Sequence, residues 1–180
     1  TRYPLVTGVQ TCALPISARW LLRSAELGNI DAQYAYASML LDPDNPRRDE
    51  KTAAHWMREA AMAGYEAAEV DFALMFANGR GVAKSYDNAF LWFQRSAQRG
   101  NAIGRNRLAR MYATGLGTAP DPVAAWTWYT LAKRQGLPDI WLETQLSGLT
   151  PAERTRAEAE ADRITAVGES FGSLSPEDTD

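Results

Sequence analysis

Hydrophobic residues recur along this chain at helical spacing, in paired stretches separated by polar turns. The first complete pair is 31–41 (DAQYAYASMLL) and 50–64 (EKTAAHWMREAAMAG), and similar pairs lie within 67–100 and 103–136. Apolar side chains three and four positions apart form one stripe of an α-helix. The pattern therefore predicts an all-α chain built from helix–turn–helix units, each with a first helix (helix A) and a second helix (helix B).

One Trp and one Gly mark every unit at a fixed interval of 36 residues. They are Trp20, Trp56, Trp92 and Trp128, and Gly28, Gly64, Gly100 and Gly136. A period of this length is typical of stacked repeats that share one continuous core. We expect an α-solenoid over residues 17–136, a truncated first unit followed by three repeats. Because the tryptophans keep the structural period, we expect each to fill the same pocket between helices.

Local signals mark the helix ends and the close contacts between helices. Asp49, Ser85 and Asp121 are placed to act as N-caps of the B helices, and Pro122 suits a first helical position. Small and large residues share a register in the three repeats, namely Ala37, Ala73 and Ala109; Ala53, Ala89 and Ala125; and Met39, Met75 and Met111. Recurrent alanines indicate close approach of helix backbones. Gly104 replaces the early Ala of helix A in the third repeat, and Lys133 stands where Ala61 and Ala97 do, which predicts looser packing at that end.

The repeat register decays after Gly136, and we expect capping helices over 137–167. A short helix within LPDIWLETQLSGL is expected to use Ile140, Trp141 and Leu146 as apolar contacts. Thr150 and Glu153 form the pattern of a capping box, which opens a charged helix to about residue 166. A charged outer helix suits the end of a repeat array. Residues 168–180 are polar and acidic, which predicts a disordered tail.

The first sixteen residues call for a separate interpretation. The stretch 6–16 (VTGVQTCALPI) resembles a translated sequencing adapter, so we expect residues 1–16 to be a non-native segment. Cys12 is the only cysteine and lies inside it, which leaves the remaining chain without thiol or disulfide chemistry. On this interpretation the natural N-terminus is missing, and the compartment stays open.

Charge and composition exclude several classes of function. A net charge of -3 argues against a nucleic-acid partner, which calls for clustered Lys and Arg on one face. No apolar run reaches the roughly 18 residues of a membrane span. His55 is the single histidine, and without a second histidine or a cysteine the usual zinc sites are excluded. We expect no catalytic residues, no metal and no cofactor.

One chemical alternative stays open at residues 168–172, where the sequence reads G-E-S-F-G. A G-x-S-x-G pattern can form a nucleophile elbow when a strand enters it and a helix leaves it. A hydrolase using Ser170 is therefore one hypothesis, although the pattern lies in a polar tail.

The repeats resemble the SEL-one-like repeats (SLR), α-solenoids related to tetratricopeptide repeats. The matching residues of the second repeat are Ala68, Phe72, Ala73, Met75, Phe76, Gly79, Gly81, Val82, Ala89, Trp92, Ala97 and Gly100. Those of the third are Leu108, Ala109, Met111, Tyr112, Gly115, Gly117, Asp121, Ala125, Trp128 and Gly136. The first repeat departs from the pattern, with Pro43 to Pro46 in place of the G-x-G loop. The resemblance implies a right-handed superhelix whose A helices line a concave groove.

The same resemblance implies a bacterial scaffold that holds other proteins together, in the envelope or in signalling, and it favours the periplasm or envelope over the cytoplasm. Alignment of the A helices on the tetratricopeptide pattern gives six candidate groove residues: Tyr34, Ser38, Val70, Leu74, Asn106 and Arg110. Their mixed aromatic, apolar and basic character suits a peptide with apolar anchors and a carboxylate. The alternative is an accessory docking arm of a larger enzyme or membrane regulator.

Overall fold

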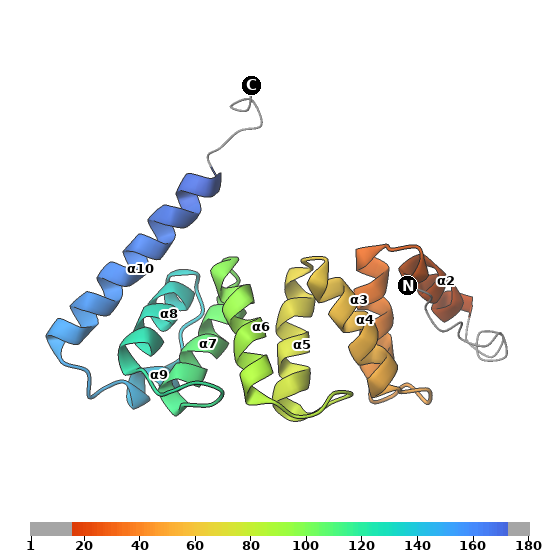
Figure 1. Ribbon diagram of the computed structural model, residues 1–180, viewed down its shortest axis with the longest axis horizontal. Helices are drawn as coiled ribbons and strands as arrows, with labels where there is room; N and C mark the ends of the chain where they lie inside the picture. Colours follow the sequence, from red (N-terminus) through yellow and green to blue (C-terminus); the bar gives the residue numbers. More distant parts are fainter. Residues whose placement is uncertain (1–15, 173–180) are drawn as a thin grey trace, which may run out of the picture. The chain divides into compact units, whose positions relative to one another are not determined.

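The computed structural model describes residues 16–172, with side chains described as far as residue 167. The elements are α2 (Ile16–Glu26), α3 (Ile30–Leu41), α4 (Glu50–Met62), α5 (Glu66–Asn78), α6 (Tyr86–Gln98), α7 (Ala102–Thr114), α8 (Pro122–Arg134), α9 (Ile140–Gln145) and α10 (Pro151–Gly172) (Figure 1). They fall into two compact units that divide after Ser85, with α2 to α5 in the first and α6 to α10 in the second. The predicted all-α fold of paired helices is confirmed.

Three helices begin at the caps that the sequence predicts. The carboxylate of Asp49 accepts from the backbone N–H of Lys51 at 3.1 Å, and that of Asp121 accepts from Ala124 at 2.9 Å. At the start of α10, the N–H of Thr150 donates to Glu153 at 2.8 Å, and the N–H of Glu153 donates to the Thr150 hydroxyl at 3.3 Å. Each side chain satisfies a helix N–H that has no partner inside the helix.

The second glycine of each G-x-G loop packs against the helix B of the preceding repeat. A Cβ on Gly81 would lie 1.8 Å from the Glu50 carbonyl oxygen, and one on Gly117 would lie 2.2 Å from that of Tyr86. Both glycines also have positive φ, of 70° and 71°. Only glycine meets both demands, because any Cβ would overlap the neighbouring backbone. These loops therefore anchor one repeat to the next within each unit.

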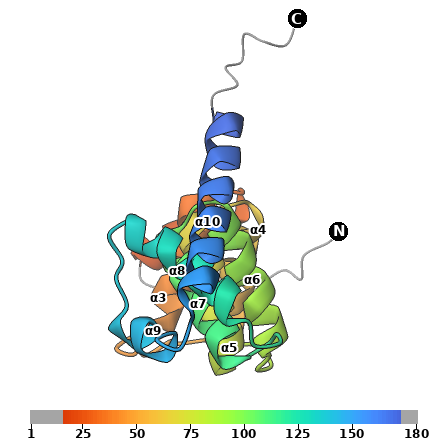
Figure 2. The same cartoon turned by 90° about the vertical axis from the view of Figure 1, so that its left-hand side faces the viewer.

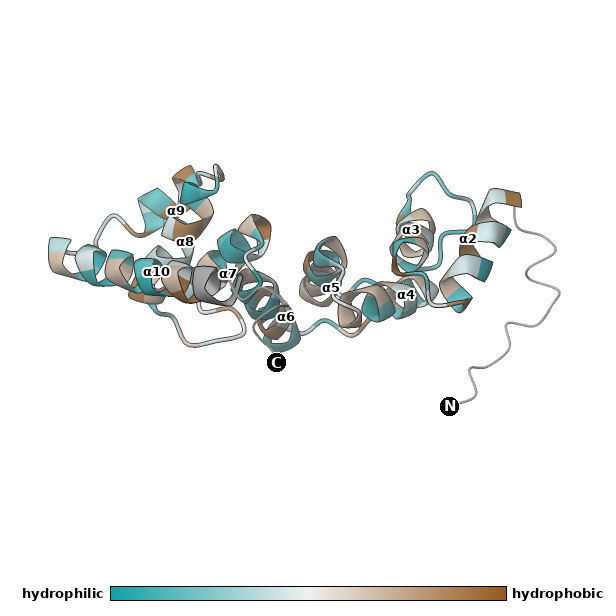
Figure 3. Cartoon of the chain, turned by 90° about the horizontal axis from the view of Figure 1, so that it is seen from above, coloured by the Kyte–Doolittle hydropathy of each residue, from teal (hydrophilic) through white to brown (hydrophobic). Residues whose placement is uncertain are grey.

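In the first unit, α4 packs between α3 and α5, and α2 packs on α3. Figure 3 shows α3 and α5 in one row, with α4 in the other. Alanines fill the crossings, since Ala37, Ala53 and Ala73 are all fully buried. The predicted small-residue contacts are confirmed, and the same holds at Ala89, Ala109 and Ala125 of the second unit.

The tryptophans do not fill the core as expected. Trp20 is 72% exposed, and Trp56, Trp92 and Trp128 are only half-buried. In the three repeats the residue after the Trp is the buried one, namely Met57, Phe93 and Tyr129. A helix turns by about 100° per residue, so the following side chain points between the helices. The Trp then lies at the edge of the core. The Trp56 ring, for example, meets the Tyr36 ring edge-on, with 6.3 Å between the ring centres.

The second unit is closed by its last two helices. Ala109, Ala125, Tyr129, Leu142 and Leu146 form one buried cluster, so α9 uses Leu142 and Leu146. Ile140 is 80% exposed, so the expected apolar contact at that position is wrong. The two buried residues are four positions apart and share one helix face.

The last helix, α10, lies alongside α8 in Figures 1 and 2. It buries Ala157 and Ala161 completely, and the Thr127 hydroxyl donates to the Ala157 carbonyl at 3.2 Å. The helix runs to Gly172, beyond the expected end near residue 166, because its turn-by-turn hydrogen bonding continues through the first residues of the expected tail. Residues 173–180 lie outside the described residues.

The Gly104 position is tightly packed, so the looser packing expected from this residue is wrong, whereas Lys133 is exposed. A Cβ on Gly104 would lie 2.5 Å from the Ser96 hydroxyl oxygen, and both residues are buried. The equivalent residues 36 positions earlier are Ala60 and Ala68, both fully buried. A larger residue on helix B is therefore matched by a smaller one on helix A.

The interpretation of residues 1–16 stays a prediction. Residues 1–15, with Cys12, lie outside the described residues, and Ile16 is the first residue of α2. None of the described helices is both long and apolar enough to cross a bilayer.

Candidate functional site

The first unit holds three of the candidate groove residues, half-buried, on its A helices. Tyr34 and Ser38 come from α3 and Leu74 from α5, and all three are half-buried. The Tyr34 hydroxyl donates to Asp71 Oδ2 at 2.9 Å, which joins the two helices. The Tyr34 ring also lies 4.7 Å from that of Tyr65, centre to centre, at an angle of 33°. We call these five residues, Tyr34, Ser38, Tyr65, Asp71 and Leu74, the Tyr34 surface.

Val70 does not belong to this surface. Its side chain is only 5% exposed, so it packs in the core and has almost no area to offer a partner. Asp71, the next residue, takes its place beside Tyr34. The sequence analysis missed Asp71 and Tyr65, although Asp71 lies three positions before Leu74, a spacing that places two side chains on one helix face.

The hydroxyl of Tyr34 is held as a hydrogen-bond donor. Burial raises its pKa, and the hydrogen bond to Asp71 and the negative charge of that carboxylate raise it further. The phenol therefore keeps its proton across the physiological range. A fixed donor in turn fixes the orientation of the Asp71 carboxylate.

The second unit holds the other two candidates, and both are bound by the chain itself. Asp139 accepts from Asn106 Nδ2 at 2.9 Å, and from Arg110 through Nε at 2.7 Å and Nη2 at 3.0 Å. The same carboxylate caps α9 by accepting from the N–H groups of Trp141 and Leu142. The guanidinium of Arg110 lies 4.9 Å from the centre of the Trp141 ring.

Asp139 is the strongest electrostatic feature of this cluster. Burial by itself would raise its pKa, but the hydrogen bonds from Arg110, Asn106 and the Leu142 N–H outweigh that effect and lower the pKa to about 2. Asp139 is 8% exposed and stays ionised at neutral pH. The carboxylate that we expected Arg110 to take from a partner is thus supplied by the start of α9. The signal in the sequence was Pro138-Asp139, a typical cap before a short helix.

The described residues offer little for catalysis or metal binding. No group of three or more His, Cys, Asp or Glu side chains within residues 16–167 is placed to hold a metal ion. His55 is exposed on α4, with its ring 5.0 Å from that of Trp56. The G-x-S-x-G pattern at 168–172 forms the end of α10, whereas a nucleophile elbow requires a strand leading into a turn.

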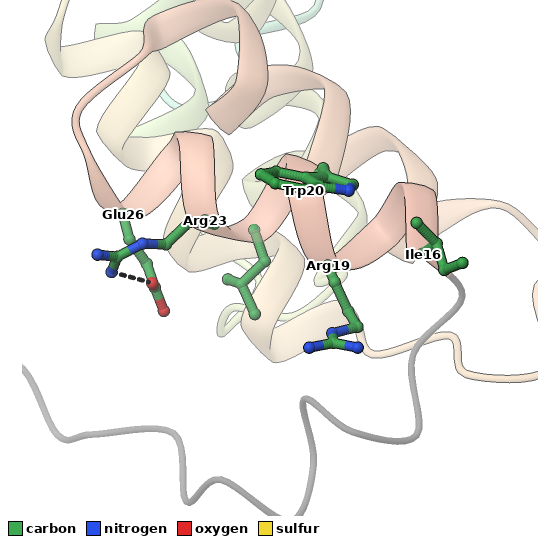
Figure 4. A pocket seen from close by; sticks show the side chains of 6 residues that line it. Ile16, Arg19, Trp20, Arg23 and Glu26 are labelled. Atoms are coloured by element: carbon green, nitrogen blue, oxygen red, sulfur yellow. Dashed lines mark hydrogen bonds and ion pairs between the residues drawn. The ribbon is translucent and has the colours of Figure 1, made fainter.

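A hollow of about 510 Å³ lies along α2 (Figure 4). It is lined by Ile16, Arg19, Trp20, Leu22, Arg23 and Glu26. Arg23 pairs with Glu26 at 3.3 Å, and Trp20 lies open beside them. Trp56, at the equivalent position of the first repeat, packs against Tyr36 of its own helix A. The face of α2 around Trp20 thus corresponds to the face of α4 around Trp56, which packs against the helix A of its own repeat, α3.

Comparison with known proteins identifies the same repeats. Four stretches of the chain match the Sel1 repeat, residues 15–29, 30–65, 67–101 and 102–137. A Sel1 repeat protein from Oxalobacter formigenes superposes with a TM-score of 0.62 at 31% identity, over 74% of this chain and 98% of that protein. No curated protein sequence matches the chain.

A second solved structure is a protective antigen, present in uropathogenic Escherichia coli strains, that displays an SLR fold. It superposes with a TM-score of 0.74 at 24% identity, over 88% of this chain and 36% of the antigen. The chain therefore spans about a third of that protein's length and shares its fold. With the four matched repeats, this likeness confirms the α-solenoid of helical repeats.

Proposed function

This chain belongs to the Sel1 repeat family, whose proteins generally serve as non-enzymatic scaffolds for protein–protein interactions, and we propose that it binds a peptide or protein segment on the Tyr34 surface. The proposal includes a bacterial setting, in the envelope or in signalling, and the two solved relatives come from bacteria. The observation that carries it is the half-buried group of Tyr34, Tyr65 and Leu74, in which the Tyr34 hydroxyl donates to Asp71 and the Tyr34 ring packs against that of Tyr65.

Two physical features support this surface as a binding site. Tyrosines concentrate binding energy at protein interfaces, because they combine a large apolar area with a hydroxyl and lose little conformational entropy. Tyr34 is already held by Asp71 and Tyr65, so a partner would meet an ordered surface. In the second unit the Asn106–Arg110 position is filled by Asp139 and Trp141, which leaves the first unit as the favoured site.

The test is selection from a phage-displayed library of random peptides, with the whole chain as the target. Leu74→Ala and Tyr34→Ala should each weaken binding of the selected peptides by about tenfold or more, as expected when an interface anchor is truncated. Leu91→Ala is the matched control, because Leu91 is 59% exposed on α6 and outside the Tyr34 surface. Circular dichroism and thermal melting confirm that each variant is folded.

Two results would contradict the proposal. The first is a selection that yields no peptide competing for one site, and the second is a set of selected peptides that bind the Tyr34 and Leu74 variants as tightly as the original chain. A loss with Leu91→Ala equal to that with Leu74→Ala would move the site to the B helices.

A second candidate function is that of a docking arm within a larger enzyme or membrane regulator. What favours it is the open face of α2, where Trp20 is 72% exposed beside a hollow of about 510 Å³. Exposed apolar surface of this kind usually marks a contact with other protein. Sequencing the source DNA upstream of the codon for Ser17 tests it. A catalytic, membrane or signalling domain there would favour the docking arm, and a signal peptide followed by further repeats would favour the envelope scaffold.

A further inference from the structure

The charged side chains on the A helices have different partners in the two units. In the second unit, the Arg110 guanidinium forms a bidentate ion pair with Asp139 and lies 4.9 Å from the centre of the Trp141 ring. A cation in this setting is stabilised twice, by charge-assisted hydrogen bonds and by attraction to the ring face. The chain itself thus supplies a complete example of a cation held between a carboxylate and an aromatic ring.

The Tyr34 surface contains the carboxylate and the rings of such a site. Asp71 accepts a hydrogen bond from the Tyr34 hydroxyl through Oδ2, and the Tyr65 ring packs against the Tyr34 ring. Within the described residues, no Lys or Arg side chain forms an ion pair with Asp71. An ionised carboxylate has about four acceptor positions, so most of the acceptor capacity of Asp71 is available to a partner.

The neighbouring positions add negative charge and apolar area. Asp31 lies three positions before Tyr34 on α3, a spacing that places it on the same helix face, and it is exposed. On α5, Leu74 follows Asp71 at the same spacing and is half-buried. Together with Asp31, the Tyr34 surface therefore presents two carboxylates with aromatic and aliphatic side chains, which is complementary to a cation next to an apolar group.

Resting on the proposed function, we propose that the Tyr34 surface binds a Lys or Arg side chain of the partner segment. The cation lies against Asp71 and the rings of Tyr34 and Tyr65, and a neighbouring apolar side chain of the partner packs on Leu74. This recognition differs from the expected carboxylate ligand, because Arg110, the residue expected to bind it, is paired with Asp139. The hydrogen bond from Tyr34 fixes the Asp71 carboxylate before binding, which reduces the entropy lost on association.

The test uses the same phage-displayed random peptides, now read for their composition. Peptides selected by the original chain should be enriched in Lys or Arg next to a Leu, Phe or Tyr. One selected peptide, synthesised and titrated by calorimetry, should bind Asp71→Asn about tenfold more weakly, as expected for loss of a charge-assisted contact. Asp44→Asn is the matched control, since Asp44 is an exposed carboxylate in the loop between α3 and α4 of the same unit.

Reversing the charge at Asp71 tests the cation site independently. Selection on Asp71→Lys should enrich Asp or Glu in place of Lys or Arg. Tyr34→Phe should lose less affinity than Asp71→Asn, because the ring and the carboxylate remain and only the hydrogen bond that fixes Asp71 is lost. Peptides that depend on Leu74 but carry no excess of Lys or Arg would overturn the cation site and leave the proposed function standing. Selected peptides that bind Leu74→Ala and Tyr34→Ala unchanged would overturn both. Equal losses with Asp71→Asn and Asp44→Asn would also overturn the cation site.

Discussion

Arg110 on α7 and Asp139 before α9 are joined by two hydrogen bonds, of 2.7 and 3.0 Å. The pair fastens the first helix after the repeats to the helix A of the third repeat. Because Asp139 also caps α9, one carboxylate fixes both the start of this helix and its position on α7. The position of α9 therefore depends on this ionised side chain as well as on the buried Leu142 and Leu146.

Asp139→Asn should lower the free energy of unfolding in a way that depends on pH. The pKa of Asp139 is lowered by the fold from an ordinary 3.8 to about 2, so its contribution is fully present above about pH 4. It is lost as pH falls towards 2, where the carboxyl group is protonated in the folded state as well. A shift of this size corresponds to about 2 kcal/mol at neutral pH.

Urea titrations of the original chain and of Asp139→Asn between pH 7 and pH 2 measure this gap. Asp162→Asn serves as the control, because the Asp162–Arg134 pair is exposed and should contribute less than about 1 kcal/mol. A gap between the original chain and Asp139→Asn that stays constant across the range would contradict the assigned role of the charge.

Gly81→Ala should be far more damaging than Gly28→Ala, although both glycines have positive φ. A methyl group on Gly81 would overlap the Glu50 carbonyl, whereas nothing lies within 4 Å of the corresponding position on Gly28. We expect a loss of more than about 2 kcal/mol for Gly81→Ala and of about 1 kcal/mol for Gly28→Ala. Chemical denaturation measures both, and equal losses would show that backbone conformation alone requires glycine at Gly81.

Gly104→Ala should cost about 1 to 3 kcal/mol, because its methyl group would press against Ser96. Ser96→Ala alone should be close to neutral, since the buried Ser96 hydroxyl has no hydrogen-bond partner among the described residues. The double variant should recover part of the loss, because Ala60 and Ala68 show that two alanines fit this crossing. A double-mutant cycle with a coupling energy near zero would refute the matching of these two residues.

Phe93→Ala should cost about 3 to 5 kcal/mol, and Trp20→Ala less than about 1 kcal/mol. Phe93 is 3% exposed in the second unit, whereas Trp20 is 72% exposed on α2. Thermal melting of the two variants compares a core residue with a member of the Trp series. A large loss with Trp20→Ala would mean that the face of α2 is covered in solution.

The sequence by itself determined the repeat, the helices and most of their ends. The 36-residue period can be read directly from the spacing of the Trp and Gly residues. Caps such as Asp49, Asp121 and Thr150 accept from N–H groups two or three residues away, so both partners of each cap lie in the same short stretch of sequence. The buried alanines could also be predicted, because a small residue that recurs in register marks a helix crossing.

The tertiary structure decided which face of each helix is covered and which polar groups meet. Period alone did not distinguish the Trp position from the one after it, because large apolar side chains recur every 36 residues at both, with Met57, Phe93 and Tyr129 at the second. Only the packing of the neighbouring helix makes the second position the buried one. Likewise, Tyr34 meets Asp71 and Arg110 meets Asp139 across 37 and 29 residues of sequence. The position of an A helix against the next element sets these contacts, and no local pattern encodes them. The sequence predicted six equivalent groove positions along the A helices. The structure instead has one open surface around Tyr34, while the Asn106–Arg110 position is occupied by Asp139 of the chain itself.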